Sequence, residues 1–142
     1  MNTIDPAVSV VVPVRNEAGN VAPLVAEIAQ SLAGQWRFEV VYVNDGSSDE
    51  TEAELQRLMA AHPWLRRVRH RQSCGQSAAV RSGVAAARAG IVVTLDGDGQ
   101  NDPAFIPAMV RALEADARLG LIAGQRVGRK ASGFKKLQSR IA

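Results

Sequence analysis

Two carboxylates, Asp96 and Asp98, stand one residue apart at the end of an apolar run, Ile91-Val-Val-Thr-Leu95. This run of β-branched and apolar residues predicts a strand that is buried on both faces. Side-chain direction repeats every second residue in an extended chain, so both carboxylates are expected to point the same way. Two such anions repel each other unless a cation lies between them, and oxygen ligands suit Mg²⁺ or Mn²⁺. The spacing therefore favours a divalent-cation site.

Two other motifs offer competing interpretations of these carboxylates. Asp and Gly both favour turns, so the stretch Asp96-Gly-Asp-Gly99 is equally compatible with a solvated turn. An EF-hand loop also opens with Asp-x-Asp, but it requires Gly at its sixth position and Glu at its twelfth. This chain has Asn101 and Pro107 there. The EF-hand is excluded, and the turn remains open.

The chain alternates apolar strand-like runs with amphipathic helix-like stretches. Strands are expected at 7–14, 38–43, 66–71 and 91–95. Helices are expected at 18–32, 75–89 and 103–117. A further helix is expected between the second and third strands, with Ser48 or Asp49 as its N-cap and its end before Pro63. The run 119–123 is compatible with a fifth strand. Strand–helix alternation specifies right-handed crossovers and a mainly parallel sheet with helices on both faces. We therefore expect a single α/β domain over residues 1–142, with 66–71 as a short strand near the sheet edge.

Polar residues follow the predicted strands at the ends where such sheets bind ligands. Arg15-Asn-Glu17 follows the first strand, Asn44 and Asp45 follow the second, and the two carboxylates follow the fourth. In open α/β sheets the ligand lies beyond the carboxyl ends of the strands. These side chains are therefore expected to gather in one polar site.

Several familiar site types are not supported. The chain has no P-loop sequence, and Pro13-Val-Arg-Asn-Glu17 stands where a dinucleotide-binding fold would carry its glycines. His62 and His70 lack metal-ligand spacing and are predicted to lie on the surface. Cys74, the single cysteine, is predicted to be a small packing residue rather than a nucleophile. A lone cysteine excludes an internal disulfide and fits a reducing compartment.

The composition of the 142-residue chain is that of an ordinary globular domain, with 46% hydrophobic and 22% charged residues. No apolar run reaches the ~20 residues needed to cross a bilayer. The net charge of +3 is too small to indicate nucleic acid by itself, but the charges are uneven. No acidic residue follows Asp116, whereas these basic ones do: Arg118, Arg126, Arg129, Lys130, Lys135, Lys136 and Arg140. This excess favours an anionic partner, either phosphate, a lipid surface or nucleic acid, with a solvated tail as the alternative.

Four motifs follow one another along almost the whole chain: Val10-Val-Val-Pro-Val-Arg-Asn-Glu17, Val43-Asn-Asp-Gly-Ser-Ser-Asp-Glu-Thr51, Gly75-Gln-Ser-Ala-Ala79 and Leu95-Asp-Gly-Asp-Gly-Gln-Asn-Asp-Pro103. Together they resemble family 2 glycosyltransferases, and most of all the polyprenyl-phosphate branch that includes dolichyl-phosphate mannosyltransferase. The resemblance implies a GT-A fold, which is a nucleotide-sugar-binding α/β sandwich. It also implies a metal-dependent, inverting transfer of a sugar from a UDP- or GDP-sugar to a polyprenyl phosphate.

The same resemblance assigns donor-binding roles to residues at the strand ends. Pro13, Arg15 and Glu17 would line the nucleotide pocket. Asp45 would accept a hydrogen bond from the base, and Asp96 would lie near the ribose and the metal.

The resemblance also assigns the residues nearest the reaction. Asp98 is implied as catalytic and, with Asp96 and Gln100, as a ligand that holds Mg²⁺ or Mn²⁺ against the donor diphosphate. Arg126 and Arg129 would face the donor or acceptor phosphates. Ser73 and Cys74 replace the Asn and aromatic residue usual in this branch, which leaves local packing open.

The resemblance implies that the chain is a donor-binding part, because relatives continue with acceptor-side residues and membrane-associated helices. Phe134, Leu137 and Ile141 fall at helical spacing among basic residues, which fits either an interfacial helix or one packed on further chain. We therefore expect peripheral contact with the inner, cytoplasmic face of a membrane. A module that binds nucleotide sugar without turnover is the alternative function.

Overall fold

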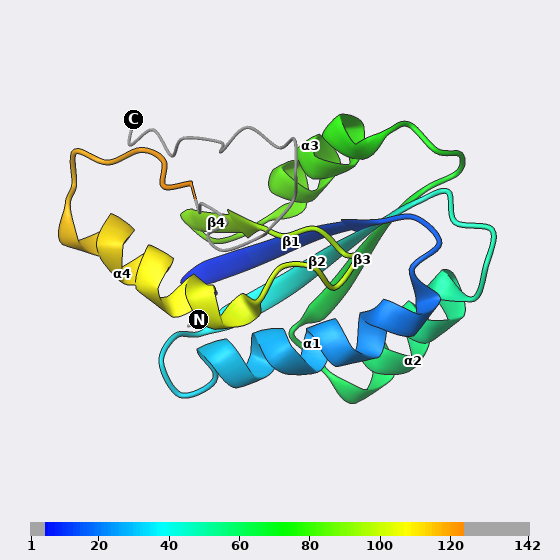
Figure 1. The fold of residues 1–142 in the computed structure, drawn as a ribbon, viewed down its shortest axis with the longest axis horizontal. Coiled ribbons are helices and arrows are strands. Elements are labelled where there is room, and N and C mark those ends of the chain that lie inside the picture. Colours follow the sequence, from blue (N-terminus) through cyan, green and yellow to red (C-terminus); the bar gives the residue numbers. More distant parts are fainter. Residues whose placement is uncertain (1–4, 124–142) are drawn as a thin grey trace, which may run out of the picture. The chain divides into compact units, whose positions relative to one another are not determined.

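The computed structural model of the chain describes residues 5–123. Its elements, in chain order, are β1 (Val8–Val14), α1 (Ala18–Leu32), β2 (Phe38–Asp45), α2 (Thr51–Ala61), β3 (Leu65–His70), α3 (Gln76–Ala86), β4 (Ile91–Thr94), the short 3₁₀ helix η1 (Pro103–Phe105) and α4 (Ile106–Ala115) (Figure 1). The backbone divides into two compact units, Met1–Ala104 and Phe105–Ala142. All four strands and α1 to α3 belong to the first unit, and α4 belongs to the second.

The strands form one parallel sheet in the order β3-β2-β1-β4. The two inner strands, β1 and β2, are the most apolar, and every residue of β1 is buried. Strands buried on both faces carry continuous apolar runs rather than alternating ones. The valine-rich sequence of β1 therefore accounts for its place inside the sheet.

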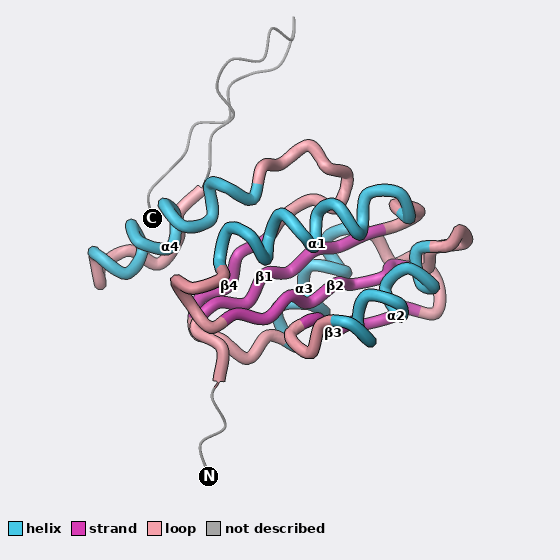
Figure 2. The backbone as a smooth tube through the Cα atoms, turned by 90° about the horizontal axis from the view of Figure 1, so that it is seen from below, coloured by secondary structure: helices cyan, strands magenta, loops and turns pink. Residues whose placement is uncertain are grey.

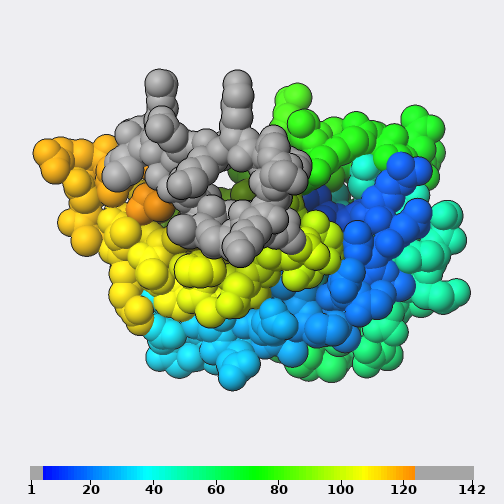
Figure 3. All heavy atoms as spheres, in the orientation of Figure 1, coloured from blue at the N-terminus to red at the C-terminus, as the bar shows by residue number. Residues whose placement is uncertain are grey.

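Side chains of β1 alternate between two helical layers. Val11 packs with Ala79 of α3 and with Val41 and Val43 of β2 in one apolar cluster. By the two-residue period of a strand, Val10 faces the opposite side, where α1 and α2 lie together, as Figure 2 shows. The outer surfaces of α1 and α2 adjoin each other in the space-filling view (Figure 3). The predicted parallel sheet with helices on both faces is confirmed.

α3 approaches the sheet closely because of Gly83. A Cβ atom built there would lie 2.3 Å from Val11 Cγ1 and 3.0 Å from Val43 Cγ2. Real Cβ contacts do not come this close without a shift of the neighbouring atoms, so a larger residue would push α3 away from β1 and β2. This close approach brings the first turn of α3 to the carboxyl end of the sheet.

The prediction that 91–95 is buried on both faces is wrong. β4 ends at Thr94, which is exposed, and its other three residues are only half-buried. Within the described residues β4 is an edge strand paired with β1 alone, so one side of it carries no strand. An apolar run indicates a strand but does not reveal its place in the sheet.

The fifth strand proposed at 119–123 is also wrong. These residues form no strand, and Leu121 is 58% exposed. Gly120 lies inside this short run, where glycine weakens a strand. In the same unit α4 starts with a proline in its first turn, where a missing N–H costs nothing, and it ends two residues before the predicted boundary at 117.

Boundaries of three further elements, β2, α2 and α3, differ from the predictions. β2 continues two residues beyond 43, so Asn44 and Asp45 belong to the strand instead of the loop after it. At α2, Glu50 occupies the N-cap position without a side-chain cap bond. Asp49 still accepts the N–H of Thr51 at 2.9 Å. α3 covers Gln76–Ala86, which is shorter than the predicted 75–89.

Candidate active site

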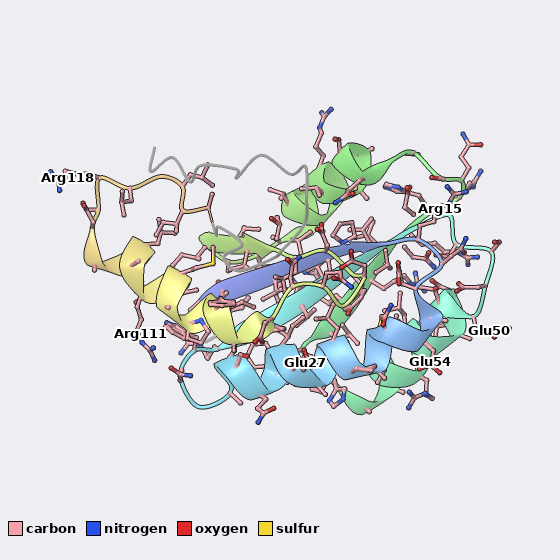
Figure 4. All side chains as sticks on the ribbon, in the orientation of Figure 1. Arg15, Glu27, Glu50, Glu54, Arg111 and Arg118 are labelled. Carbon is pink, nitrogen blue, oxygen red and sulfur yellow. The ribbon has the colours of Figure 1, made fainter. Side chains whose placement is uncertain are left out.

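A pocket of about 370 Å³ opens at the carboxyl ends of β1, β2 and β4. This volume lies within the range of about 300–1,000 Å³ that is typical of small-molecule sites. Figure 4 shows Arg15, an exposed residue, at this end of the sheet. The pocket is lined by Pro13, Val14, Arg15, Glu17, Asp45, Ser73, Gly75, Gln76, Ala79, Asp96, Gly97 and Asp98. All of these residues belong to the first compact unit.

Asn16 joins the loop after β1 to the loop after β2. Its φ of 55° is in the left-handed region, which Asn tolerates better than most residues. Its Oδ1 accepts the backbone N–H groups of Ser48 at 2.8 Å and Asp49 at 3.3 Å, and its own N–H donates to Ser47 Oγ at 2.9 Å. These bonds hold Arg15 on a loop that is fixed before any ligand binds.

A second set of bonds connects the start of α1 to α2. The N–H of Glu17 donates to Thr51 Oγ1 at 3.0 Å, and the N–H of Ala18 donates to Asp49 Oδ2 at 3.3 Å. The Glu17 carboxylate in turn accepts Asn20 Nδ2 at 2.7 Å. Glu17 is therefore oriented by protein contacts where it lines the pocket.

Asp45 accepts four hydrogen bonds, two on each carboxylate oxygen. Oδ1 receives the N–H of Cys74 at 2.7 Å and lies 2.9 Å from His70 Nδ1. Oδ2 receives Ser73 Oγ and the N–H of Gly75, both at 3.0 Å. The whole residue is only 5% exposed. Asp45 therefore fixes the loop before α3, and a hydrogen bond from a nucleotide base would require one of these donors to move aside.

These donors also determine the ionisation of Asp45. Burial raises the pKa of its carboxyl, but the bonds from Cys74, His70, Ser73 and Gly75 outweigh burial and lower the pKa to about 2. Hydrogen bonds to the charged form of a carboxyl favour that form. The pocket wall therefore carries a fixed negative charge.

The predictions for His70 and Cys74 are wrong. The His70 side chain is only 15% exposed, because it pairs with Asp45 across β2 and β3 and lies 2.7 Å from Ser82 Oγ of α3. Cys74 is exposed rather than packed, since it lies in the loop before α3. Strand register brings His70 to Asp45, and the loop before α3 brings Cys74 to it. Neither effect can be read from the spacing of these residues in the sequence.

Asp96 and Asp98 both line the pocket, but not through strand alternation. β4 has already ended at Thr94, and residues 97–98 form a turn. Gly97 between the carboxylates packs so closely on the end of β1 that a Cβ would lie 2.2 Å from Val14 Cγ1. The turn anticipated as an alternative is thus present, and Asp96 and Asp98 on either side of Gly97 both line the pocket.

Neighbouring groups orient the two carboxylates. Asp96 Oδ1 accepts Gln76 Nε2 of α3 at 2.9 Å, and Asp98 Oδ1 accepts the backbone N–H of Gln100 at 2.9 Å. Asp98 is exposed and Asp96 is half-buried. Both side chains offer only oxygen atoms, the ligand type that Mg²⁺ and Mn²⁺ prefer.

The structure brings six of the predicted site residues together: Pro13, Arg15, Glu17, Asp45, Asp96 and Asp98. Gln100 is not among the residues that line the pocket, and its backbone rather than its side chain contacts Asp98. Arg126 and Arg129 lie outside the described residues. Sequence reasoning did not select Gln76 and Ser73 as site residues, although Gln76 stands in the third motif and its neighbour Gly75 marks a helix start.

No helix in the described part of the chain is both long enough and apolar enough to span a bilayer.

Comparison with protein families gives one match over nearly the whole chain, to the model described as glycosyl transferase family 2, at residues 9–141. Dodecaprenyl-phosphate galacturonate synthase of Rhizobium johnstonii is 40% identical over 124 residues, which cover 86% of this chain and 36% of that protein. Undecaprenyl-phosphate 4-deoxy-4-formamido-L-arabinose transferase of Edwardsiella ictaluri is 36% identical over 137 residues, which cover 94% of this chain and 41% of that protein. The chain thus spans about two fifths of the length of these relatives.

Solved structures with a similar fold include a mannosyltransferase and the S. aureus protein TarS. The mannosyltransferase PcManGT from Pyrobaculum calidifontis, in complex with GDP-Man and Mn²⁺, matches with a TM-score of 0.71 and 30% identity over 83% of this chain and 35% of that one. TarS of S. aureus, residues 1–349, matches with a TM-score of 0.65 and 20% identity over 76% of this chain and 32% of that one. The predicted GT-A-like α/β fold is confirmed by this likeness.

Proposed function

This chain belongs to glycosyl transferase family 2, and on that basis we propose that it carries the donor-binding part of an enzyme that transfers a sugar from a UDP- or GDP-sugar to a polyprenyl phosphate. The transfer inverts the configuration of the sugar and depends on Mg²⁺ or Mn²⁺. The observation that carries the proposal is the pocket, where three strand ends bring Asp45, Asp96, Asp98 and Arg15 together in a chain of this family. The relatives named for dodecaprenyl and undecaprenyl phosphate support the choice of acceptor.

The pocket suits a nucleotide sugar by its size and its mixed charge. Its volume of about 370 Å³ accommodates a small polar molecule. Arg15 is exposed and supplies a cationic group for the donor, while Pro13 and Glu17 complete that wall. Because Asn16 already fixes this loop, little ordering free energy would oppose donor binding.

Asp96 and Asp98 fit a hard divalent cation. Both line the pocket, both offer only oxygen atoms, and each is oriented by a hydrogen bond to one of its oxygens. When bound there, Mg²⁺ or Mn²⁺ would stabilise the negative charge that develops on the nucleoside diphosphate leaving group. PcManGT, which has a similar fold, was solved with GDP-Man and Mn²⁺.

Besides binding the metal, the enzyme must hold two anions in position, the donor diphosphate and the acceptor lipid phosphate. A phosphate monoester has a second pKa near 6, so a lipid phosphate is largely ionised at neutral pH and needs little help from a general base. Positioning the donor against this nucleophile is then the larger requirement. We assign contacts with the donor or acceptor phosphates to Arg126 and Arg129, and we place the reaction at the inner, cytoplasmic face of a membrane.

The test is donor binding by the Asp98→Asn variant. A panel of UDP- and GDP-sugars is screened with Mn²⁺ by thermal shift, since a ligand at a hundred times its Kd stabilises the folded state by about 2.7 kcal/mol. We expect the wild type to be stabilised by at least one donor and Asp98→Asn to lose most of that shift. Glu27→Gln, an exposed residue of α1 labelled in Figure 4, is the matched control. Equal donor shifts in all three proteins would refute the metal role of Asp98.

A binding module without turnover is the second candidate, because the chain spans about two fifths of its relatives' length. The two candidates separate when the chain is incubated with labelled donor, Mn²⁺ and a polyprenyl phosphate. Labelled glycolipid is expected from the enzyme, and donor binding without glycolipid is expected from the module.

A further inference from the structure

Three side chains of metal-ligating type meet beside the pocket: Asp45, His70 and Cys74. One ligand atom of each, a carboxylate oxygen, a ring nitrogen and the thiol sulfur, lies within 4.8 Å of the other two. The Asp96 and Asp98 pair contributes nothing to this group. The proposed transfer reaction gives the three side chains no common role.

The fold itself brings these three residues together. Asp45 and His70 are partners in the parallel register of β2 and β3, so their side chains leave the sheet side by side on the face covered by α3. The loop that carries Cys74 is fastened to Asp45 through the Cys74 N–H at 2.7 Å and the Gly75 N–H at 3.0 Å. The cluster is therefore set by strand register and backbone contacts.

We propose that Asp45, His70 and Cys74 form a Zn²⁺ site with one position open to water. Zn²⁺ takes Cys, His and carboxylate ligands at about 2.0–2.3 Å, which in a tetrahedral site places the ligand atoms roughly 3.3–3.8 Å apart. Asp45 Oδ1 and His70 Nδ1 are hydrogen-bonded at 2.9 Å, so Zn²⁺ would take the place of the proton between them and these two atoms would separate by roughly 0.4 Å. The Cys74 sulfur lies within 4.8 Å of both and would approach by about 1 Å. The Cys74 side chain can make this movement, because it is exposed and its thiol donates only a long bond, 3.4 Å, to the Gln72 carbonyl.

The second ring nitrogen of His70 has a hydrogen-bond partner, as zinc-binding histidines almost always do. Its Nε2 lies 2.7 Å from Ser82 Oγ, and its Nδ1 faces Asp45. With Zn²⁺ on Nδ1, the ring proton resides on Nε2 and is donated to Ser82. A second-nitrogen hydrogen bond of this kind fixes both the tautomer and the ring orientation of a ligating histidine.

This site differs in chemistry from the all-oxygen pair at Asp96 and Asp98. Sulfur and imidazole ligands select Zn²⁺, whereas carboxylates alone suit Mg²⁺ and Mn²⁺. The chain would therefore hold two cation sites of different preference around one pocket. The zinc site does not depend on the proposed transfer reaction, and it is tested with metal alone.

The experiment titrates the metal-free 142-residue chain with Zn²⁺ by calorimetry, in excess Mg²⁺ to saturate the all-oxygen pair. We expect one Zn²⁺ per chain in the wild type. Cys74→Ser and His70→Gln should each weaken binding at least about a hundredfold, and Ser82→Ala about tenfold, since losing even an outer hydrogen bond costs about 10–100-fold. Replacing Zn²⁺ with Co²⁺ should give a thiolate-to-cobalt absorption band that Cys74→Ser abolishes.

His62→Gln is the matched control, because His62 stacks on Trp64 and is not part of the cluster. Cys74→Ser changes an exposed side chain and should keep the wild-type circular dichroism, so its result stands even if His70→Gln folds poorly. Zn²⁺ affinity equal to wild type in Cys74→Ser, or a cobalt complex without a thiolate band, would overturn the proposal. So would the loss of binding in His62→Gln.

Discussion

The carboxylate of Asp45 holds the loop 73–75 through three donors from that loop, and it can do so fully only while it is ionised. A protonated carboxyl would present an O–H towards groups that are themselves donors. Burial and these bonds together leave the pKa at about 2. The conformation of loop 73–75, which forms part of the pocket wall, thus depends on the ionisation of Asp45.

Asp45→Asn should lower the free energy of unfolding at pH 7 by about 1–3 kcal/mol, because the amide N–H₂ faces buried donors. The pH dependence should change as well. A folded pKa near 2 lies below the unfolded value of about 3.9, so this contribution is complete above about pH 4 and is lost as the pH falls towards 2. Urea unfolding between pH 2 and pH 7 measures both effects.

Glu39 also contributes to the loss of stability at low pH, in the wild type and in Asp45→Asn alike. Burial raises the pKa of its carboxyl, but the bonds from Arg88, Ser9 and Arg66 outweigh burial, so the pKa of Glu39 is lowered overall. The difference between wild type and Asp45→Asn therefore isolates Asp45. If the two stability curves ran parallel from pH 5 to pH 2, Asp45 would not titrate as described.

The site residues found from the sequence stand at the carboxyl ends of strands or just after them. Arg15 and Asp96 were accessible because a strand end can be located from its apolar run. His70, Ser73 and Gln76 were missed because they reach the site through strand register and the position of α3. Neither property is encoded in local spacing.

α3 is the element on which the site geometry depends most. It supplies Gln76 to Asp96, Ser82 to His70 and Ala79 to the pocket wall. Its distance from the sheet is set at Gly83, where no Cβ fits against Val11. The packing of one helix thus positions groups at three places around the pocket.

Gly83→Ala should destabilise the fold by about 1–3 kcal/mol, the usual cost of added volume in a packed core. Gly19→Ala is the matched control, because a Cβ there meets nothing within 4 Å and Gly19 lies within α1. The control should be neutral or more stable by up to about 1 kcal/mol, since alanine restricts the unfolded chain. Equal urea midpoints for the two variants would contradict the close contact described here.

Element types were predicted more reliably than element ends. The apolar stripe of α1 gave its bounds of 18–32 correctly, because five buried residues repeat at helical spacing. The end of β2 was placed two residues early, since polar Asn44 and Asp45 resemble a loop although both are buried. The edge position of β4 depends on which strands pair, a tertiary property that periodicity does not contain.

Charge is divided along the molecule as a whole. All 14 acidic residues lie at or before Asp116, whereas seven of the 17 basic residues follow it. A cluster of basic residues is attracted to an anionic lipid surface by about 1 kcal/mol per residue. We infer that the basic residues after Asp116 make the proposed membrane contact through a surface attraction of this kind.

We expect the chain to bind vesicles of anionic lipid more tightly than neutral ones, with binding that weakens as salt increases. Replacing Lys135, Lys136 and Arg140 together with Gln should remove about 3 kcal/mol, which is on the order of a hundredfold in affinity. Co-sedimentation with vesicles at several salt concentrations measures this change.

The matched control replaces three exposed basic residues of the first unit, Arg69, Arg71 and Arg81, with Gln. Both triple variants lose the same charge, so a difference between them reports where the charge acts rather than how much is present. We expect the control to bind within about threefold of wild type, because Arg69, Arg71 and Arg81 lie outside the basic segment that we infer to contact the lipid. If both variants bound equally weakly, attraction would follow net charge alone, and the basic residues after Asp116 would not be a membrane-binding segment.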